Sequence, residues 1–223
     1  MKPLFISEET ETFRADLAAT ARSLYEQGWM PGTSGNLSVR SGEAVLITAS
    51  GRSKRTLCEH DTVLVDPDGG SPLTGESEWP SAETSIHLAV YRGLSDASAV
   101  IHAHTPYATA LATLAGTGEG GGRVVFEELE LAKGLGVADP LRVELPVLAN
   151  WTDVQRIAAD AAAHLDPMPS NLAPALLVER HGVTVWGATL DQARDRLECV
   201  EELSRLALLT ADRSNPTALG ANR

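Results

Sequence analysis

Apolar residues recur at helical spacing in several stretches of the chain. Between residues 8 and 27, Phe13, Leu17, Ala21 and Leu24 fall on one stripe, and Gly28 follows where a helix would end. Periodicity and capping residues predict further helices over residues 82–92, 106–115 and 152–165, and from Thr189 onward.

Short β-leaning runs lie between these helices. They cover residues 37–40 and 44–48, which form a hairpin pattern, and residues 62–65, 99–103, 176–179 and 183–186. Strands and helices mix along the whole length, and no linker separates two halves. We therefore predict one α/β domain over residues 1–223, with helices covering a sheet. The polar residues from about Asp212 predict a loose tail.

Composition narrows the class of protein. Hydrophobic residues make up 43% of the chain, enough for a substantial core, and the net charge is −12. That charge argues against a nucleic-acid groove and against adhesion to an anionic membrane. Two cysteines, Cys58 and Cys199, are too few for a disulfide scaffold. The chain has no apolar leader and no membrane-length apolar run, so we expect a cytoplasmic protein.

The strongest chemical signal is a pair of histidines in one strand. His102 and His104 are two residues apart in an apolar run, so in a strand both side chains point to the same face. His181, before Gly182, supplies a third imidazole from a strand end. Three imidazoles that leave one coordination position open are typical of a catalytic zinc site. The plain alternative is two buried histidines that happen to alternate.

The other three histidines differ in context. His60 lies in a polar turn and His164 lies late in a helix, so we expect both to be solvated. His87 lies one turn after Glu83 on the same helical face. We predict that it is a neighbour of the site or a capped surface residue rather than a ligand.

Acidic residues offer candidates for a catalytic base. Glu127, Glu128 and Glu130 cluster after an apolar run, although for any one of them taken alone a solvated acidic helix start is the better explanation. Glu83 lies at the start of a predicted helix, where anions are favoured. Composition alone does not choose between these glutamates.

Loops of small residues could bind an anion. The segments Gly32–Asn36 and Thr48–Gly51 and the predicted helix start at Ser81 offer backbone N–H groups and hydroxyls that could converge on a phosphate. Each loop alone is a weak signal and is better explained as an ordinary turn. Basic residues nearby could add positive charge or merely be exposed; they are Arg52, Lys54 and Arg55.

Taken in order, five short motifs resemble the class II aldolase and adducin family from about residue 10 to residue 210. The motifs are Gly32–Asn36, Thr48–Gly51, Pro80–Glu83, His102–His104 and Arg180–Gly182. The resemblance implies a three-layer α/β/α fold with a mostly antiparallel central sheet, assembled as a homotetramer. It also implies a Zn²⁺ ion held by His102, His104 and His181, although manganese, iron or cobalt could occupy the same imidazoles.

The resemblance leaves two candidates for the acid/base. In the family's dehydratases it is the glutamate three residues before a Lys-Gly pair, here Glu130. In the aldolases it is the glutamate of the P-S-x-E motif, here Glu83, so the motifs alone do not decide. Phosphate contacts would fall on Gly35, Asn36, Ser50, Gly51 and Ser81.

Within the family the chain most resembles the dehydratases, through the stretches Gly28–Asn36, Glu128–Gly134 and Arg180–Gly187. This implies zinc-dependent dehydration of 5-methylthioribulose 1-phosphate to 2,3-diketo-5-methylthiopentyl 1-phosphate, a step of methionine salvage. The alternatives are a sugar-phosphate aldolase or 4-epimerase, and a non-catalytic adducin-like binding module.

Two departures from the aldolase pattern bear on this choice. Aldolases and epimerases use a tyrosine near the C-terminus, and this chain has no tyrosine after Tyr107. Ala82 stands where several aldolases carry a second serine, which weakens that part of the phosphate site.

Overall fold

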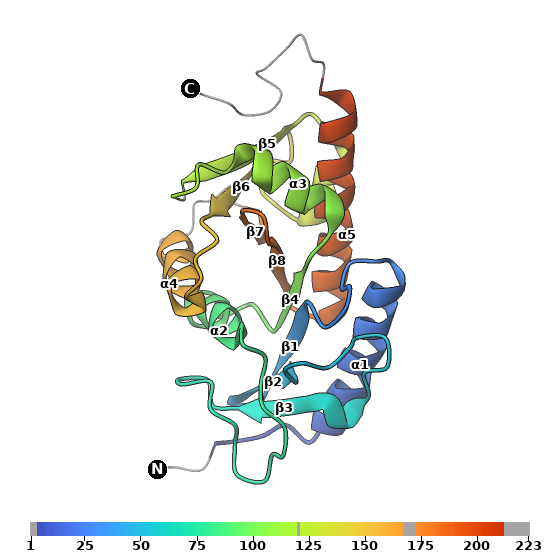
Figure 1. Cartoon of the computed structure of the whole chain (residues 1–223), viewed down its shortest axis with the longest axis vertical. Coiled ribbons are helices and arrows are strands. Elements are labelled where there is room, and N and C mark those ends of the chain that lie inside the picture. The colour runs from blue at the N-terminus through green and yellow to red at the C-terminus, as the bar shows by residue number, and fades with distance from the viewer. Residues whose placement is uncertain (1–3, 120, 167–172, 212–223) are drawn as a thin grey trace.

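One eight-stranded sheet organises the molecule (Figure 1). The computed structural model describes residues 4–119, 121–166 and 173–211, so the loose tail predicted from about residue 212 lies outside the described residues. The strands are β1 (Asn36–Ser41), β2 (Ala44–Thr48), β3 (Thr62–Val65), β4 (Ala99–Ala103), β5 (Gly122–Glu127), β6 (Arg142–Leu148), β7 (Ala175–Val178) and β8 (Gly182–Gly187). The helices are α1 (Thr10–Glu26), α2 (Thr84–Gly93), α3 (Pro106–Ala115), α4 (Val154–Leu165) and α5 (Leu190–Thr210), with short 3-10 turns η1 (Glu59–Asp61) and η2 (Glu130–Leu135).

The strand order is β3-β2-β1-β4-β8-β7-β6-β5. Neighbouring strands are antiparallel except for β6 and β7, which are parallel. The predicted α/β fold with a mostly antiparallel sheet is therefore confirmed, and the sheet is mixed because of this one parallel pair. In this order β4 lies between β1 and β8, which come from opposite ends of the chain.

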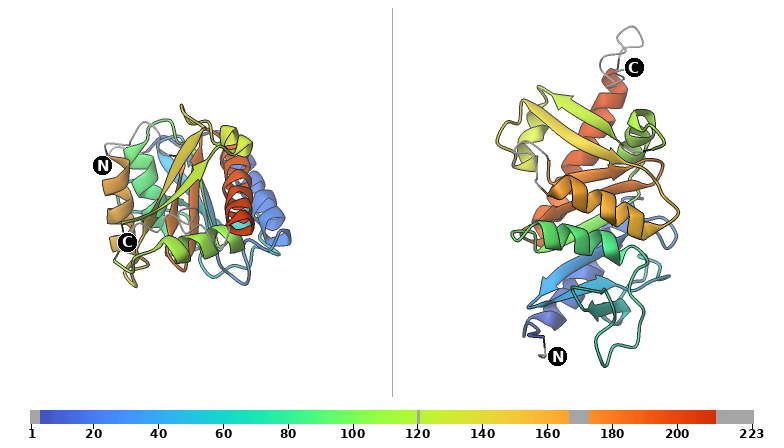
Figure 2. Two further views of the ribbon diagram at one scale, coloured as in Figure 1. Left: turned by 90° about the horizontal axis from the view of Figure 1, so that it is seen from above. Right: turned by 90° about the vertical axis from the view of Figure 1, so that its left-hand side faces the viewer.

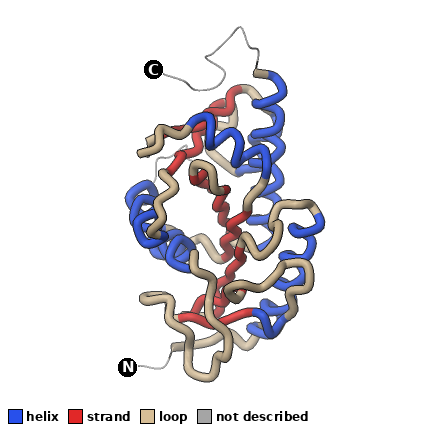
Figure 3. The backbone as a smooth tube through the Cα atoms, viewed as in Figure 1, coloured by secondary structure: helices blue, strands red, loops and turns tan. Residues whose placement is uncertain are grey.

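Helices cover both faces of the sheet, as the left-hand view of Figure 2 shows. The helices α1, α3 and α5 pack on one face through residues such as Leu17, Leu111 and Leu197. The helices α2 and α4 pack on the other face, where Ile86 and Ile157 join a second core. The backbone tube shows the strands as a column between these two layers (Figure 3). The three-layer architecture is confirmed.

Element boundaries follow local hydrogen bonding. The predicted strand over residues 99–103 and helix over residues 106–115 match β4 and α3. The helix α2 begins at Thr84 rather than at residue 82, because the Thr84 N–H bonds the Ser81 carbonyl in a turn before the helix. None of the described helices combines the length and the apolar character that a membrane span requires.

Two strands were not predicted from the sequence. They are β5, which follows a glycine-rich loop and forms an edge of the sheet, and β6, which contains Pro146. The acidic segment was predicted as a possible helix start, but Glu127 ends β5 and only Glu130 begins the 3-10 turn η2. Between them Glu128 takes a left-handed backbone conformation with φ 56°.

Candidate metal centre

The strand β4 carries two of the three predicted ligands to one place. His102 is fully buried within the strand, and His104 lies one residue beyond its end. Their Nε2 atoms lie 3.2 Å apart. The His104 backbone N–H bonds the Trp29 carbonyl, which ties the end of β4 to the loop after α1.

His181 reaches the same place from the turn between β7 and β8. Its backbone N–H bonds the Val178 carbonyl, and Arg180 before it adopts φ 55°, a costly conformation for a residue other than glycine. Gly182 lies against β4, where an added Cβ would stand 2.3 Å from the Ala103 carbonyl oxygen. Only glycine allows this approach. The turn therefore brings His181 next to the β4 pair.

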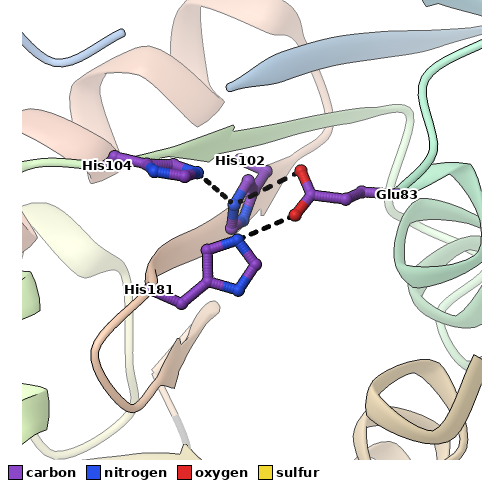
Figure 4. A group of neighbouring side chains, drawn as sticks. All are labelled: Glu83, His102, His104 and His181. Carbon is purple, nitrogen blue, oxygen red and sulfur yellow. Dashed lines mark hydrogen bonds and ion pairs between the residues drawn. The ribbon is translucent and has the colours of Figure 1, made fainter. Parts of the chain in front are cut away.

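Glu83, at the N-terminus of α2, completes the group. Its Oε1 lies 2.8 Å from His181 Nε2, and its Oε2 lies 3.6 Å from His102 Nε2. The close-up shows three imidazoles from two strand ends facing one carboxylate from a helix (Figure 4). Ser81 supports this position, since its Oγ accepts the Glu83 backbone N–H at 3.3 Å.

The spacing of these atoms fits a metal ion. One ligand atom from each of Glu83, His102, His104 and His181 lies within 4.8 Å of the others. Donors at 2.0–2.1 Å from a tetrahedral zinc ion lie about 3.3 Å from one another. Three of the separations, 2.8, 3.2 and 3.6 Å, lie close to that value. His102 also has a supporting partner, because Thr184 Oγ1 lies 2.9 Å from its Nδ1 and leaves Nε2 facing the group.

The electrostatics of the group also suit a cation. Burial lowers the pKa of His102 to about 3 against the opposing charge of Glu83, and burial likewise lowers the pKa of His104. Both imidazoles are therefore neutral near pH 7, the form that binds metal. Burial raises the pKa of Glu83, but His102, His181 and Asn36 together outweigh it and hold that pKa well below its ordinary range.

The three predicted phosphate-binding loops lie next to one another. Ala49 pairs with Pro80 in an isolated β-bridge, and the Ser50 N–H bonds the Trp79 carbonyl. This contact brings Ser50 and Gly51 beside the loop that carries Ser81. Gly51 has φ 69° and open space where a Cβ would be.

Asn36 and Gly35 border the metal centre directly. An added Cβ on Gly35 would lie 3.0 Å from the His102 carbonyl oxygen. The Asn36 side chain donates to Glu83 Oε2 at 2.6 Å and lies 2.6 Å from His87 Nε2. His87 is fully buried, so its interpretation as a surface residue is wrong and its interpretation as a neighbour of the site is confirmed.

Lys54 joins two of these loops, which its sequence context did not reveal. It is 2% exposed, and its Nζ donates to the Thr33 carbonyl at 2.8 Å and to the Arg52 carbonyl at 3.1 Å. Burial lowers the pKa of Lys54 to about 8, although Glu83 opposes the shift. The other basic candidates are exposed: Arg52 pairs with Glu78, and Arg55 lies over the Tyr25 ring.

Glu130 lies outside the group of close ligand atoms. Its side chain is 84% exposed and pairs with Lys133 Nζ at 2.7 Å. Of the two predicted acid/base candidates, the described part of the chain brings only Glu83 within reach of the imidazoles. The remaining histidines behave as expected, since His60 and His164 are exposed.

The fold and the centre together match one family. A family profile described as "Class II Aldolase and Adducin N-terminal domain" covers residues 15–208. The chain therefore belongs to the class II aldolase and adducin family.

Two relatives have more specific names. The chain is 50% identical over 196 residues to a probable bifunctional methylthioribose-1-phosphate isomerase/methylthioribulose-1-phosphate dehydratase of Nocardia farcinica, a match that spans 88% of this chain but 35% of that protein. It is 40% identical over 195 residues to a methylthioribulose-1-phosphate dehydratase of Microcystis aeruginosa, with 86% of this chain and 93% of the relative covered.

A solved structure extends the comparison to the aldolases. The L-fuculose-1-phosphate aldolase of Thermus thermophilus aligns with a TM-score of 0.67 and 31% identity, over 87% of this chain and 95% of that one. The chain is thus similar to both dehydratases and aldolases.

Proposed function

We propose that this protein is a hydro-lyase that dehydrates 5-methylthioribulose 1-phosphate to 2,3-diketo-5-methylthiopentyl 1-phosphate in methionine salvage. The observation that carries the proposal is the group of three imidazoles and one carboxylate within 4.8 Å. It occurs in a chain that matches a named dehydratase over 93% of that relative's length. The lack of tyrosine after Tyr107 supports a dehydratase over an aldolase or epimerase.

A zinc ion bound by His102, His104 and His181 would polarise the substrate's C2 carbonyl and make the C3 proton more acidic. The protein's contribution is to present three imidazole rings that already converge, with ring centroids 4.9 to 5.1 Å apart. Thr184 fixes the orientation of the His102 ring. Glu83 has one oxygen at His181 and the other at Asn36, so it stands ionised at the edge of the ligand group.

Two glutamates are proposed for proton transfer. Glu130 would take the C3 proton and help protonate the departing C4 hydroxyl, as in the dehydratases that the chain resembles. Because its side chain is 84% exposed, it would have to turn toward the imidazoles or act with a neighbouring subunit of the proposed homotetramer. Glu83 needs no such movement, so it is the competing candidate.

Paired glutamine variants distinguish these roles. We expect Glu130→Gln to keep its metal and lose about 10²–10⁴-fold in kcat, the usual contribution of a general acid or base. We expect Glu83→Gln to lose metal affinity as well, because it removes a carboxylate from the ligand group. Metal content and kcat should be measured for both variants. Near-normal turnover of Glu130→Gln would remove Glu130 from the mechanism.

The phosphate of the substrate is proposed to bind across the adjoining loops. Backbone groups of Gly35 and Gly51 and the hydroxyls of Ser50 and Ser81 are the proposed contacts, together with Asn36. Buried Lys54 supplies positive charge beside these loops in a protein whose net charge is −12.

The decisive experiment is a substrate comparison. The purified, zinc-loaded protein is incubated separately with 5-methylthioribulose 1-phosphate, fuculose 1-phosphate and ribulose 5-phosphate. Formation of the diketone from the first substrate alone is expected. Release of dihydroxyacetone phosphate from fuculose 1-phosphate would instead favour the aldolase function that the similarity to the Thermus thermophilus structure suggests. A protein that binds no metal and turns over no substrate would be an adducin-like binding module.

A further inference from the structure

A chain of buried polar side chains runs from Glu83 away from the metal centre. Asn36 Nδ2 donates to Glu83 Oε2 at 2.6 Å, and Asn36 Oδ1 lies 2.6 Å from His87 Nε2. On the far side of the ring, His87 Nδ1 lies 2.7 Å from Ser38 Oγ, which lies 2.8 Å from the Tyr91 hydroxyl. The four residues behind Glu83 are between 0% and 4% exposed.

The chain follows from the periods of one helix and one strand. Glu83, His87 and Tyr91 are four residues apart at the start of and along α2, so they share one face. Asn36 and Ser38 are two residues apart on β1 and share the face that α2 covers. Each contact therefore crosses between the helix and the strand, and the helix end that holds Glu83 is bonded to the sheet.

The ionised carboxylate sets the direction of every hydrogen bond. A carboxylate only accepts, so the Asn36 amide turns its NH₂ group to Glu83 and its oxygen to His87. That oxygen requires a proton on His87 Nε2. Burial lowers the pKa of His87 to about 4, so the ring is neutral and its Nδ1 must accept from Ser38. Ser38 in turn accepts from the Tyr91 hydroxyl, whose pKa burial raises.

We propose that His87 is a positioning residue, which acts through Asn36 to hold Glu83 Oε2 in a fixed hydrogen bond and to keep Oε1 directed at the imidazoles. The role of this carboxylate toward metal and substrate rests on the proposed function. The arrangement of the His87 ring does not depend on the proposed function, because it follows from contacts among the protein's own side chains. Without a donor at His87, the buried Asn36 oxygen loses its partner and the amide is no longer held in place, so its hydrogen bond to Glu83 Oε2 is no longer fixed.

The first test reads the tautomer directly. Nitrogen-15 NMR of histidine-labelled, metal-free protein should show His87 as a neutral ring protonated at Nε2 near pH 7, assigned by loss of the signal in His87→Phe. A ring protonated at Nδ1, or a charged ring, would overturn the proposal. This result does not depend on any substrate, so it stands or falls separately from the dehydratase assignment.

The second test uses a graded set of variants. His87→Phe fills the space but removes both hydrogen bonds, and we expect at least a 10-fold loss in kcat with a smaller change in KM. His87→Gln retains an N–H that can reach Asn36, so it should recover part of that loss. Tyr91→Phe removes only the last donor and should change kcat less than about threefold, since Ser38 can still donate to His87.

Exposed His164 provides the control, and His164→Gln should behave as wild type. Wild-type kcat in both His87 variants would overturn the proposal, as would equal losses in His87→Phe and His87→Gln. If His87→Phe does not fold, His87→Gln and the NMR measurement on the unmodified protein still decide the question. A wild-type protein without dehydratase activity would refute the proposed function and leave the tautomer result unaffected.

Discussion

Removing the Thr184 hydroxyl tests how the sheet prepares His102 for metal. Thr184 on β8 pairs with His102 on β4 across the ladder, and its Oγ1 lies 2.9 Å from His102 Nδ1. Both residues are fully buried. Thr184→Val keeps the shape of the side chain and removes only the hydrogen-bonding group.

The expected loss can be worked out from the two tautomers of His102. Metal binding needs a free lone pair on Nε2, so the proton must be on Nδ1, where the valine side chain of Thr184→Val offers no acceptor. An unsatisfied buried N–H costs about 1–3 kcal/mol. The metal-free form escapes this cost by moving the proton to Nε2, which faces His104 and Glu83. The cost therefore falls on the metal-bound form and corresponds to about a 5- to 150-fold loss of affinity.

The assay is competition for Zn²⁺ against a chelator of known affinity, performed on metal-free wild type and Thr184→Val. Thr113→Val is the matched control, because Thr113 Oγ1 also makes one hydrogen bond, at 2.7 Å to the Thr109 carbonyl on α3. The control should keep wild-type affinity. Unchanged affinity in Thr184→Val would refute the argument that Thr184 sets the tautomer of His102, and so would an equal loss in both variants.

Two further predictions concern charge. Lys54→Met should raise KM for the phosphorylated substrate about 10-fold or more, because it removes a buried charge that could make a charge-assisted hydrogen bond to phosphate. It also removes the hydrogen bonds of Lys54 to the Thr33 and Arg52 carbonyls. As the control, Arg123→Gln changes an exposed residue and should leave steady-state kinetics unchanged. An unchanged KM would show that Lys54 has no part in phosphate binding. The metal-free protein should lose stability as the pH falls below about 6.5. Burial lowers the pKa of His102 to about 3 and that of His87 to about 4. Below pH 6.5 the unfolded chain therefore binds protons that the folded chain does not, which favours unfolding. Thermal unfolding between pH 8 and pH 5 measures this, and His87→Phe should show a shallower dependence; a flat profile in the wild type would contradict it.

Local periodicity was enough to predict the parts of the fold with clear signals. The apolar run of β4 predicts a strand, and the two-residue spacing of His102 and His104 then places both imidazoles on one face of it. The strand β5 gave no such signal, since its apolar run, Val124–Phe126, is only three residues long and lies between a glycine-rich loop and an acidic segment. The strand β6 was hidden by Pro146, because proline normally argues against a central strand.

The supporting residues of the centre could not be predicted because they depend on strand pairing. His102 is flanked at one level by Asn36 on β1 and by Thr184 on β8. Those two strands are far apart in the sequence, and no local sequence pattern indicates that both lie next to β4. Lys54 was hidden for a similar reason, since its burial depends on the loop that contains Thr33.

Asn36 links the metal centre to the proposed phosphate site, and its hydrogen-bonding capacity shows how. The amide has two N–H hydrogens and one oxygen; Glu83 accepts one hydrogen, and the oxygen faces His87. The family resemblance predicts that Asn36 also contacts phosphate, and the remaining N–H is the group that such a contact would use. Glu83 and the phosphate are then two anions that accept hydrogen bonds from one NH₂ group, and His87 fixes the plane of that group. An anion at the loops and the orientation of Glu83 would thus depend on the same amide, so losing His87 should disturb both.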